Sequence, residues 1–255
     1  MEQANYWSDV YTVRSYETEP EGRTAVQTLC NYLQEAAVGH ARILGFSVEH
    51  MQTKGLIWVL SRLHLKMQRY PRWRDTVRVA TWPSGVRRLF ACRDFELWDG
   101  QDRLLGCATS DWLLVDLATF KPVPVSSDIA NTCATERGRV FEAPPIKLPD
   151  LERVEQERTF QARLSDLDFN HHVNNVNYIE WALEAAPEKI RRECQLAELQ
   201  VVFRAASDYG DQIVSQSCLI EDGGRKSFLH RLRRAGEQKN LTEVKSIWTA
   251  AEAGI

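Results

Sequence analysis

The segment Asp166–Tyr178, with the sequence DLDFNHHVNNVNY, combines side chains that could act together on a carbonyl group. In an extended segment, alternate side chains share a face, which would place Asp168, Asn170 and His172 on one side. A carboxylate, an amide and an imidazole would then converge directly ahead of an apolar helical run. We predict a catalytic site at this place.

Acyl transfer to water is the chemistry that this set predicts. A thioester suits it, because the thiol leaving group, with a pKa near ~8.5, departs as a thiolate with little help from an acid. The enzyme then has to activate water and polarise the carbonyl oxygen. His172 or Asp168 would activate the water, Asn170 would orient it, and backbone N–H groups around residues 173–176 would polarise the carbonyl.

Helix capping explains part of the segment but not all of it. Asn is a preferred N-cap residue, so we expect Asn174 or Asn175 to cap the following helix. His171 falls on the opposite face in the extended reading, and we expect it to be a packing or surface residue. Three polar side chains on one face exceed what a cap requires, and this favours the catalytic interpretation.

The bulk composition is that of an ordinary globular protein, with 255 residues, 44% hydrophobic and 26% charged. The net charge of −3 argues against nucleic-acid binding. The six cysteines show no CxxC and the six histidines no HxxxH or HExxH, so we expect no metal and no cofactor. Without a signal peptide or a membrane-length apolar run, we expect a reduced cytoplasmic protein that does not associate with membranes.

Arginines gather at Arg87-Arg88 and again at Arg231, Arg233 and Arg234. Such clusters could meet an acidic protein or a phosphate. Solvated strand ends and turns are the more ordinary interpretation of each.

Two halves of the chain repeat one order of elements. In each half an extended segment and a helix precede four strand-like runs, and a sheet wrapped around a central helix is the natural packing of such a unit. The expected helices cover about 23–44 and 175–186, and Pro187 stops the second. The expected strands cover 56–67, 76–82, 89–98 and 103–116 in the first half, and 197–206, 212–221, 227–235 and 241–250 in the second.

Short matches in the same order support a duplication. They pair Asn31–Ala37 with Asn177–Leu183, Tyr70 and Asp75-Thr76-Val77 with Tyr209 and Asp211-Gln212-Ile213, and Ala108–Trp112 with Val244–Trp248. The Pro-rich stretch Ala143–Pro149 is the expected linker, which places the domain boundary near residue 148.

The Asp166–Tyr178 run closely resembles the DLDxNxHVNNxxY signature of acyl-ACP thioesterases, the plant fatty-acyl enzymes and their bacterial relatives. The resemblance extends from about Tyr11 to Trp248. It implies an α+β fold of two tandem hotdog domains, each an antiparallel sheet wrapped around a central helix. It also implies hydrolysis of fatty acyl-ACP to free fatty acid and holo-ACP, which terminates fatty acid synthesis. In the first half it rests on Trp58–Arg62, Arg69-Tyr70-Pro71 with Trp73, Thr81–Gly85 and Ala108–Trp112.

By this resemblance, the family's catalytic Asp, Asn and His fall on Asp168, Asn170 and His172. The family's further Glu and Cys, expected in the next strand, fall on Ala206 and Ser207. Ser207 thus stands at the nucleophile position, but a serine hydroxyl needs its own activating base. The mechanism that we expect is therefore attack by water, assisted by Asp168 and His172.

The resemblance also divides the work between the two domains. Residues 149–255 carry the catalytic motif, whereas the corresponding segment 17–24 of the first domain, residues 1–148, has no histidine. The first domain would be non-catalytic and would shape the acyl-chain pocket. Glu180, on the second helix, is a minor candidate for a helix-borne acid, for which a solvated or salt-bridged position is the more ordinary interpretation.

Two alternative functions stay open. One is an acyl-CoA thioesterase, which performs the same chemistry on another carrier; an arginine patch at the tunnel mouth would favour ACP, and a nucleotide pocket would favour CoA. The other, from a different class, is a non-hydrolytic acyl-binding hotdog protein, with Ala206 and Ser207 as signs of decay. The complete Asp168, Asn170 and His172 set counts against it. The expected partner is acyl carrier protein with its phosphopantetheine-linked acyl chain, and a homodimer is compatible with the sequence.

Overall fold

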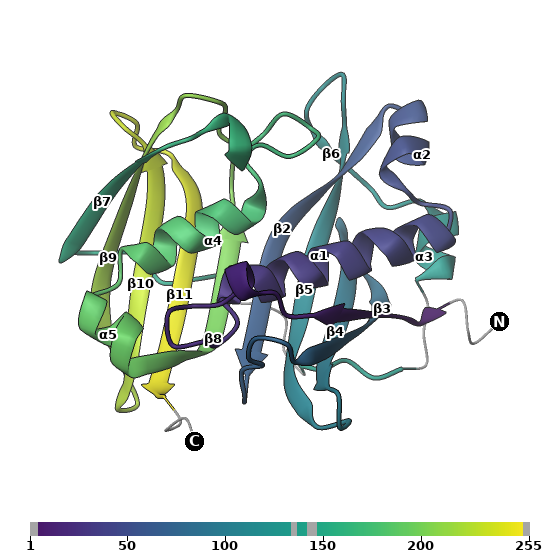
Figure 1. The fold of residues 1–255 in the computed structure, drawn as a ribbon. Helices are drawn as coiled ribbons and strands as arrows, with labels where there is room; N and C mark the ends of the chain where they lie inside the picture. The colour runs from purple at the N-terminus through teal and green to yellow at the C-terminus, as the bar shows by residue number, and fades with distance from the viewer. Residues whose placement is uncertain (1–4, 134–136, 142–146, 252–255) are drawn as a thin grey trace. The chain divides into compact units, whose positions relative to one another are not determined.

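The computed structural model describes residues 5–133, 137–141 and 147–251 (Figure 1). The chain divides into two compact units, residues 1–144 and 145–255. The sequence predicts a boundary near residue 148. The first four residues of the expected linker, Ala143–Pro149, lie outside the described residues. No helix in the described part of the chain is both long enough and apolar enough to cross a membrane.

The first unit is an antiparallel sheet with a long helix packed against it. The strands lie in the order β1-β3-β4-β5-β2, with β6 beside β5, and α1 contacts β1 and β3. Leu29, Leu33 and Ala36 of α1 are buried, as are Val79 and Leu97 of the sheet. The elements are β1 (Trp7–Thr12), η2 (Ser15–Glu17), α1 (Val26–Ile43), α2 (Val48–Thr53), β2 (Leu56–Met67), β3 (Thr76–Arg87), β4 (Phe90–Asp99), β5 (Leu104–Asp116), β6 (Pro122–Val123) and α3 (Ser127–Thr132).

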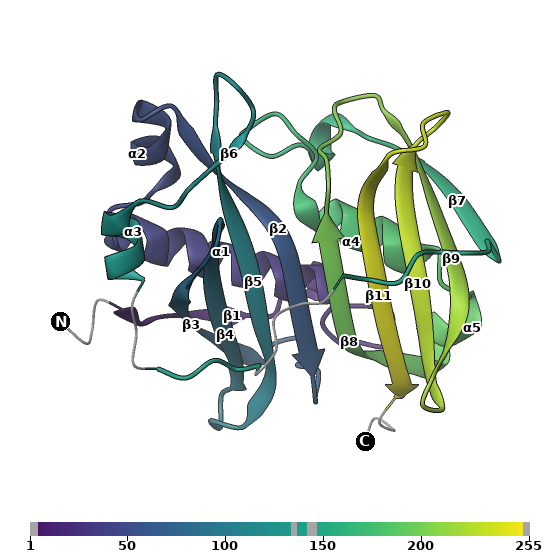
Figure 2. The same cartoon turned by 180° about the vertical axis from the view of Figure 1, so that it is seen from behind.

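The second unit repeats this arrangement. Its strands lie in the order β8-β11-β10-β9-β7, all antiparallel, and α4 packs against β9, β10 and β11. The segment before β7 crosses the opposite face of the sheet (Figure 2). The elements are β7 (Gln156–Gln161), η3 (Leu164–Asp166), α4 (Asn175–Glu184), α5 (Glu188–Glu193), β8 (Cys194–Phe203), β9 (Gln212–Asp222), β10 (Arg225–Arg234) and β11 (Asn240–Ala250).

Helix α4 is buried because apolar side chains occupy most of its circumference. Val176, Ile179 and Leu183 recur at helical spacing and are at most 8% exposed, and Tyr178 and Trp181 are buried as well. Burying one such side chain contributes about 1.5–3 kcal/mol, so the sheet holds the helix start firmly in place.

The two units share a set of backbone hydrogen bonds, which strengthens the duplication expected from sequence. Thr24 N–H donates to the carbonyl of Pro71 in the first unit, as Val173 N–H does to that of Ser207 in the second. A tryptophan indole also donates to the serine two residues earlier in each unit. The two bonds are Trp112 to Ser110 at 2.8 Å and Trp248 to Ser246 at 2.9 Å.

Two of the residue matches expected within the duplication are wrong. The Thr28 side chain donates to the carbonyl of Glu17, the last residue of η2, and the Asn177 side chain donates to the carbonyl of Asp166, the last residue of η3. Asn177 therefore corresponds to Thr28 and not to Asn31. The match of short sequence segments was displaced there by three residues, which is close to one helical turn and so preserves the helical pattern. The equivalence of Pro71 and Ser207 likewise aligns Tyr70 with Ala206 rather than with Tyr209.

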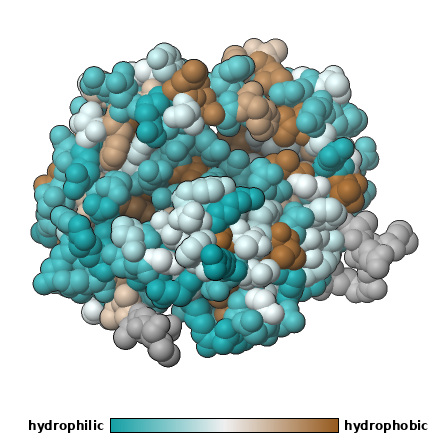
Figure 3. Space-filling model, viewed as in Figure 1, coloured by the Kyte–Doolittle hydropathy of each residue, from teal (hydrophilic) through white to brown (hydrophobic). Residues whose placement is uncertain are grey.

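On the face seen in Figure 1 the surface is mostly hydrophilic, with hydrophobic residues in separate small patches (Figure 3). Exposed large side chains of the second unit include Phe169 and Tyr209, each 66% exposed, and Leu164 at 73%. Scattered exposed apolar residues are ordinary for a folded protein. Phe169 is of interest for its position, because it lies within the segment that carries the expected catalytic residues.

Candidate active site

The segment between η3 and α4 is a tight hairpin, and the extended segment expected from the sequence is wrong. Leu167 pairs with Val173, the N–H of Asp168 donates to the carbonyl of His172 at 2.8 Å, and His171 N–H closes the turn onto the carbonyl of Asp168. His171 adopts a left-handed conformation with φ of 63°. A turn bond followed by a left-handed residue is a common three-residue hairpin connection, which sequence alternation does not reveal.

The hairpin still places Asp168 and His172 on one face, for a reason different from the one expected. The two residues are opposite partners across the turn, and opposite partners share a face of a ladder. Asn170 lies within the turn rather than beside them in a row. The hairpin, and not alternation along an extended segment, is what relates Asp168 to His172.

The first unit contains the same hairpin and shows that this pair of positions can bring side chains into contact. There Glu19 N–H donates to the carbonyl of Arg23, Gly22 N–H donates back to Glu19, and Gly22 has φ of 78°. The side chains of Glu19 and Arg23 form an ion pair at 3.1 Å. Glu19 and Arg23 thus stand where Asp168 and His172 stand in the second unit.

Each expected catalytic side chain has a defined setting in the second unit. Oδ1 of Asp168 accepts the backbone N–H of Asn170 at 2.8 Å, which leaves the second carboxylate oxygen without a hydrogen-bond partner among the described residues. Asp168 and Asn170 are partly buried, whereas His172 is exposed and makes no side-chain hydrogen bond within that part of the chain. The imidazole is therefore accessible from solvent.

The start of α4 offers fewer free backbone donors than the sequence predicts. Val173 N–H donates to the carbonyl of Ser207, Asn174 N–H to that of Asp166, and Val176 N–H to Oδ1 of Asn174 at 3.1 Å. Asn174 is therefore the N-cap, which confirms one of the two expected candidates. Of the N–H groups of residues 173–176, that of Asn175 alone makes no hydrogen bond to a described residue, so it is the donor left there for a carbonyl oxygen.

Ala206 and Ser207 lie in a loop and not in the strand where we expected them. β8 ends at Phe203, because Arg204 and Ala205 both turn their N–H groups to the carbonyl of Leu241. Ala206 is exposed and Ser207 is fully buried. The Ala206 carbonyl accepts a bond from Arg234 at 2.8 Å.

Ser207 is hydrogen-bonded to the phenol of Tyr178 and not to a base. Its N–H donates to Oη of Tyr178 at 2.7 Å, and its own Oγ lies 2.6 Å from the same phenol oxygen. Burial raises the pKa of the Tyr178 phenol, so the phenol remains protonated and cannot deprotonate the serine. This geometry suits a structural hydroxyl and gives no support to Ser207 as a nucleophile.

Acidic and basic side chains brace the hairpin at its base. Asp166 is 3% exposed and pairs with Arg163 at 2.8 Å, while its carbonyl accepts from Asn174 and Asn177. Burial alone would raise the pKa of Asp166, but the hydrogen bonds from Arg163 outweigh it and hold that pKa below the usual range. Burial also raises the pKa of Glu180, which makes no hydrogen bond or ion pair to a described residue.

Tyr178 and Arg163 have roles that the sequence interpretation missed. A tyrosine in an apolar helical run needs a polar partner once it is buried, and this signal could have indicated Tyr178. Arg163 and Asp166 stand three residues apart ahead of a turn, the spacing of a reciprocal cap. Arg163 holds Asp166 at the start of the hairpin, and Tyr178 holds Ser207, whose carbonyl accepts from Val173 at its end.

Both units match one family. The acyl-ACP thioesterase N-terminal domain matches residues 4–133 and the acyl-ACP thioesterase C-terminal domain matches residues 150–250. Oleoyl-acyl carrier protein thioesterase 1 of Arabidopsis thaliana is 31% identical, over 95% of this chain and 75% of the relative. A palmitoyl-acyl carrier protein thioesterase of Cuphea hookeriana is 29% identical, over 93% of this chain and 61% of the relative.

Solved structures give the same result for the fold. An acyl-ACP thioesterase from Bacteroides thetaiotaomicron has a TM-score of 0.86 at 25% identity and covers 98% of this chain and 100% of its own. A 12:0-ACP thioesterase from Umbellularia californica also has a TM-score of 0.86, at 23% identity, with 96% and 94% covered. The tandem hotdog fold expected from the sequence is confirmed. With both domains matched in order, the chain belongs to the acyl-ACP thioesterase family of thioester hydrolases.

Proposed function

We propose that this chain hydrolyses fatty acyl-ACP to free fatty acid and holo-ACP, with Asp168 and His172 as the catalytic pair. The observation that carries the proposal is the hairpin, in which the two residues are opposite partners beside the capped start of α4. The family match supports acyl-ACP as the substrate class.

In the proposed mechanism, His172 removes a proton from water, and the resulting hydroxide attacks the thioester carbonyl carbon. The Asp168 carboxylate stabilises the imidazolium through the oxygen that does not accept from Asn170. The N–H of Asn175 donates to the oxyanion of the tetrahedral intermediate. When the C–S bond breaks, the thiolate leaves with the electron pair and takes up the proton, which gives a carboxylic acid and the carrier thiol.

Asn170 orients the attacking water in this scheme, and Ser207 has a structural role. The bond from Val173 to the carbonyl of Ser207 ties the hairpin to the loop after β8. The Tyr178 phenol in turn fixes Ser207. Catalysis by water needs no covalent acyl-enzyme, so the loss of the family's cysteine is compatible with activity.

The division of labour expected from the sequence is part of this proposal. The second unit, which we assign to residues 149–255, performs the chemistry. The first, residues 1–148, is non-catalytic, because its hairpin carries the Glu19–Arg23 ion pair, and it binds the acyl chain. We place the enzyme in the cytoplasm, where fatty acyl-ACP is available and where cysteines remain reduced.

Purified protein incubated with acyl-ACPs and acyl-CoAs of C4 to C18 tests the proposal. Free thiol is followed over time, and we expect faster release from acyl-ACP than from the acyl-CoA of the same length. Equal or faster release from acyl-CoA would favour the acyl-CoA thioesterase. No release from any substrate would contradict the enzyme and favour an acyl-binding protein.

A further inference from the structure

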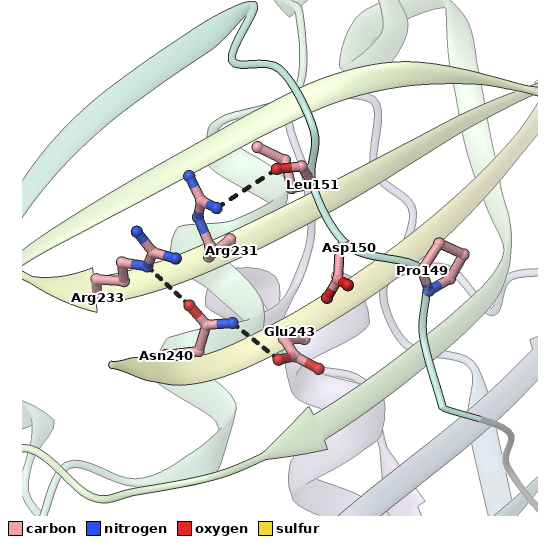
Figure 4. A pocket seen from close by; sticks show the side chains of 7 residues that line it. All are labelled: Pro149, Asp150, Leu151, Arg231, Arg233, Asn240 and Glu243. Carbon is pink, nitrogen blue, oxygen red and sulfur yellow. Dashed lines mark hydrogen bonds between the residues drawn. The ribbon is translucent and has the colours of Figure 1, made fainter. Parts of the chain in front are cut away.

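A hollow lies on the sheet face of the second unit that α4 does not cover (Figure 4). Its wall is formed by Arg231 and Arg233 of β10, by Asn240 and Glu243 of β11, and by the segment that begins at Pro149. The alternate residues His230 and Leu232 are buried on the side that α4 packs against. Residues of β10 that alternate with them therefore face the hollow.

Arg231 is held in place by neutral groups. Its Nη2 donates to Oε1 of Gln216 at 2.6 Å, its Nε to the same oxygen at 3.2 Å, and its Nη1 to the carbonyl of Leu151 at 3.4 Å. Burial and the charge of Arg233 both lower the pKa of Arg231. The guanidinium is thus desolvated in part and is placed beside another cation.

Arg233 is also bonded to neutral groups. Its Nε donates to Oδ1 of Asn240 at 2.7 Å, and its Nη1 donates to Oε1 of Gln238 at 3.1 Å. Among the described residues, neither Arg231 nor Arg233 forms an ion pair with a carboxylate. The two arginines are two residues apart on one strand, so their Cα atoms are ~7 Å apart. A single oxyanion can bridge side chains at this spacing, because each guanidinium can donate to a different oxygen atom.

The two acids in the wall do not neutralise the arginines. Glu243 is the opposite partner of Arg231 in the ladder, yet its carboxylate accepts from Arg204 at 2.9 Å and from Asn240 at 2.8 Å. Asp150 is exposed and makes no hydrogen bond or ion pair to a described residue. The hollow opens where Arg231 and Glu243 turn away from each other.

We propose that Arg231 and Arg233 form a binding site for a small oxyanion, of the phosphate or carboxylate type, on the outer face of the second unit's sheet. The oxyanion bridges the unpaired donors of the two guanidiniums and relieves their mutual repulsion. Asp150, at the opposite wall, opposes binding by its like charge. The site is separate from the hairpin that carries Asp168 and His172, so it does not depend on the proposed catalytic mechanism.

Titration of the full-length protein with inorganic phosphate, and separately with acetate, tests the site by calorimetry at constant ionic strength. The two arms distinguish phosphoryl from carboxylate groups. We expect saturable binding of at least one anion. Arg231→Gln and Arg233→Gln should each weaken it by about tenfold or more, the usual effect of losing hydrogen bonds to a charged group. Asp150→Asn should strengthen it by about two- to fivefold, because a nearby like charge is removed.

Arg192→Gln is the matched control. Arg192 pairs with Glu188 at 2.7 Å on α5 and is largely exposed, so its loss changes the net charge equally and should leave binding unchanged. Arg231→Gln also removes the contact with Leu151; should that variant unfold, Arg233→Gln and Asp150→Asn decide the outcome. The proposal is overturned when neither anion binds saturably. It is also overturned when Arg233→Gln and Asp150→Asn bind as the unmodified protein does.

Discussion

Asp168 and His172 are joined across a three-residue turn by a backbone hydrogen bond of 2.8 Å, from the N–H of Asp168 to the carbonyl of His172. The bond fixes which side chains share a face, and so it converts two residues four apart in sequence into a candidate acid–base pair. In the first unit the same relationship brings Glu19 and Arg23 into an ion pair. The duplicated scaffold thus holds an acidic residue opposite a basic residue in each unit, an ion-paired arginine in the first and a histidine in the second.

Replacing either member of this pair should impair catalysis. We expect His172→Ala and Asp168→Ala each to lower kcat on acyl-ACP by about 10² or more, the usual contribution of a general base. Steady-state kinetics measures the effect. His171→Asn is the matched control, since it removes the neighbouring imidazole while Asn tolerates the left-handed backbone. Near-normal kcat for His172→Ala would refute the assignment of the base.

His171 should matter for its backbone and not for its ring. Its φ of 63° is costly for a β-branched residue, and the equivalent residue in the first unit is Gly22. We expect His171→Val to lower the free energy of unfolding by about 1–2 kcal/mol and to reduce kcat, because the hairpin that orients Asp168 is strained. His171→Gly should keep both close to normal. Urea unfolding and kinetics on the pair of variants test this, and equal behaviour of the two would contradict it.

Ser207 should prove dispensable for chemistry. Ser207→Ala removes one hydroxyl, while the Tyr178 phenol still accepts the N–H of residue 207, so we expect a loss of about 0.5–1.5 kcal/mol in stability and nearly normal kcat. Tyr178→Phe leaves the N–H and the hydroxyl of Ser207 buried without a partner, and should cost about 1–3 kcal/mol.

The two variants together separate a structural from a nucleophilic role. Thermal unfolding gives the stability and initial rates give kcat. Loss of activity in Ser207→Ala with unchanged stability would restore the nucleophile hypothesis. A trapped acyl-serine on residue 207, observed by mass spectrometry of the intact protein, would do the same.

The sequence predicted helices and their caps well because these depend on local residue patterns. Helical spacing predicted α4, and the preference of Asn for N-caps predicted Asn174. The turn at Phe169–His171 was missed because histidine is only modestly favoured in the left-handed conformation, and alternation of side chains does not show which histidine adopts it. The end of β8 was missed for a similar reason, since Leu241, distant in sequence, draws Arg204 and Ala205 out of the strand.

Ala206→Glu should increase turnover. Ala206 is exposed and precedes Ser207, whose carbonyl accepts from Val173 at the base of the hairpin, so a carboxylate added there is tied to the catalytic loop. An additional acid can share the activation of water with His172. Ala206→Gln, equal in size and uncharged, is the control and should leave kcat unchanged. An unchanged kcat in Ala206→Glu would mean that water activation in this chain is complete without that acid.

His230 should make the protein less stable in mild acid. Its ring is 2% exposed, Nε2 lies 2.8 Å from Oγ of Ser246, and burial lowers its pKa from 6.5 to about 3. Between these two values the unfolded chain binds a proton that the folded chain does not. The free energy of unfolding therefore falls as pH drops below 6.5, by up to about 1.4 kcal/mol per pH unit from this residue.

Urea unfolding at pH 7.5 and pH 5.0 measures how the free energy of unfolding changes with pH. It is measured for the unmodified protein, for His230→Gln and for His50→Gln, which replaces an exposed histidine on α2. We expect His230→Gln to be less stable at pH 7.5 but to lose less stability on acidification, and His50→Gln to follow the unmodified protein. Equal slopes for all three would show that His230 is not the group that responds to pH.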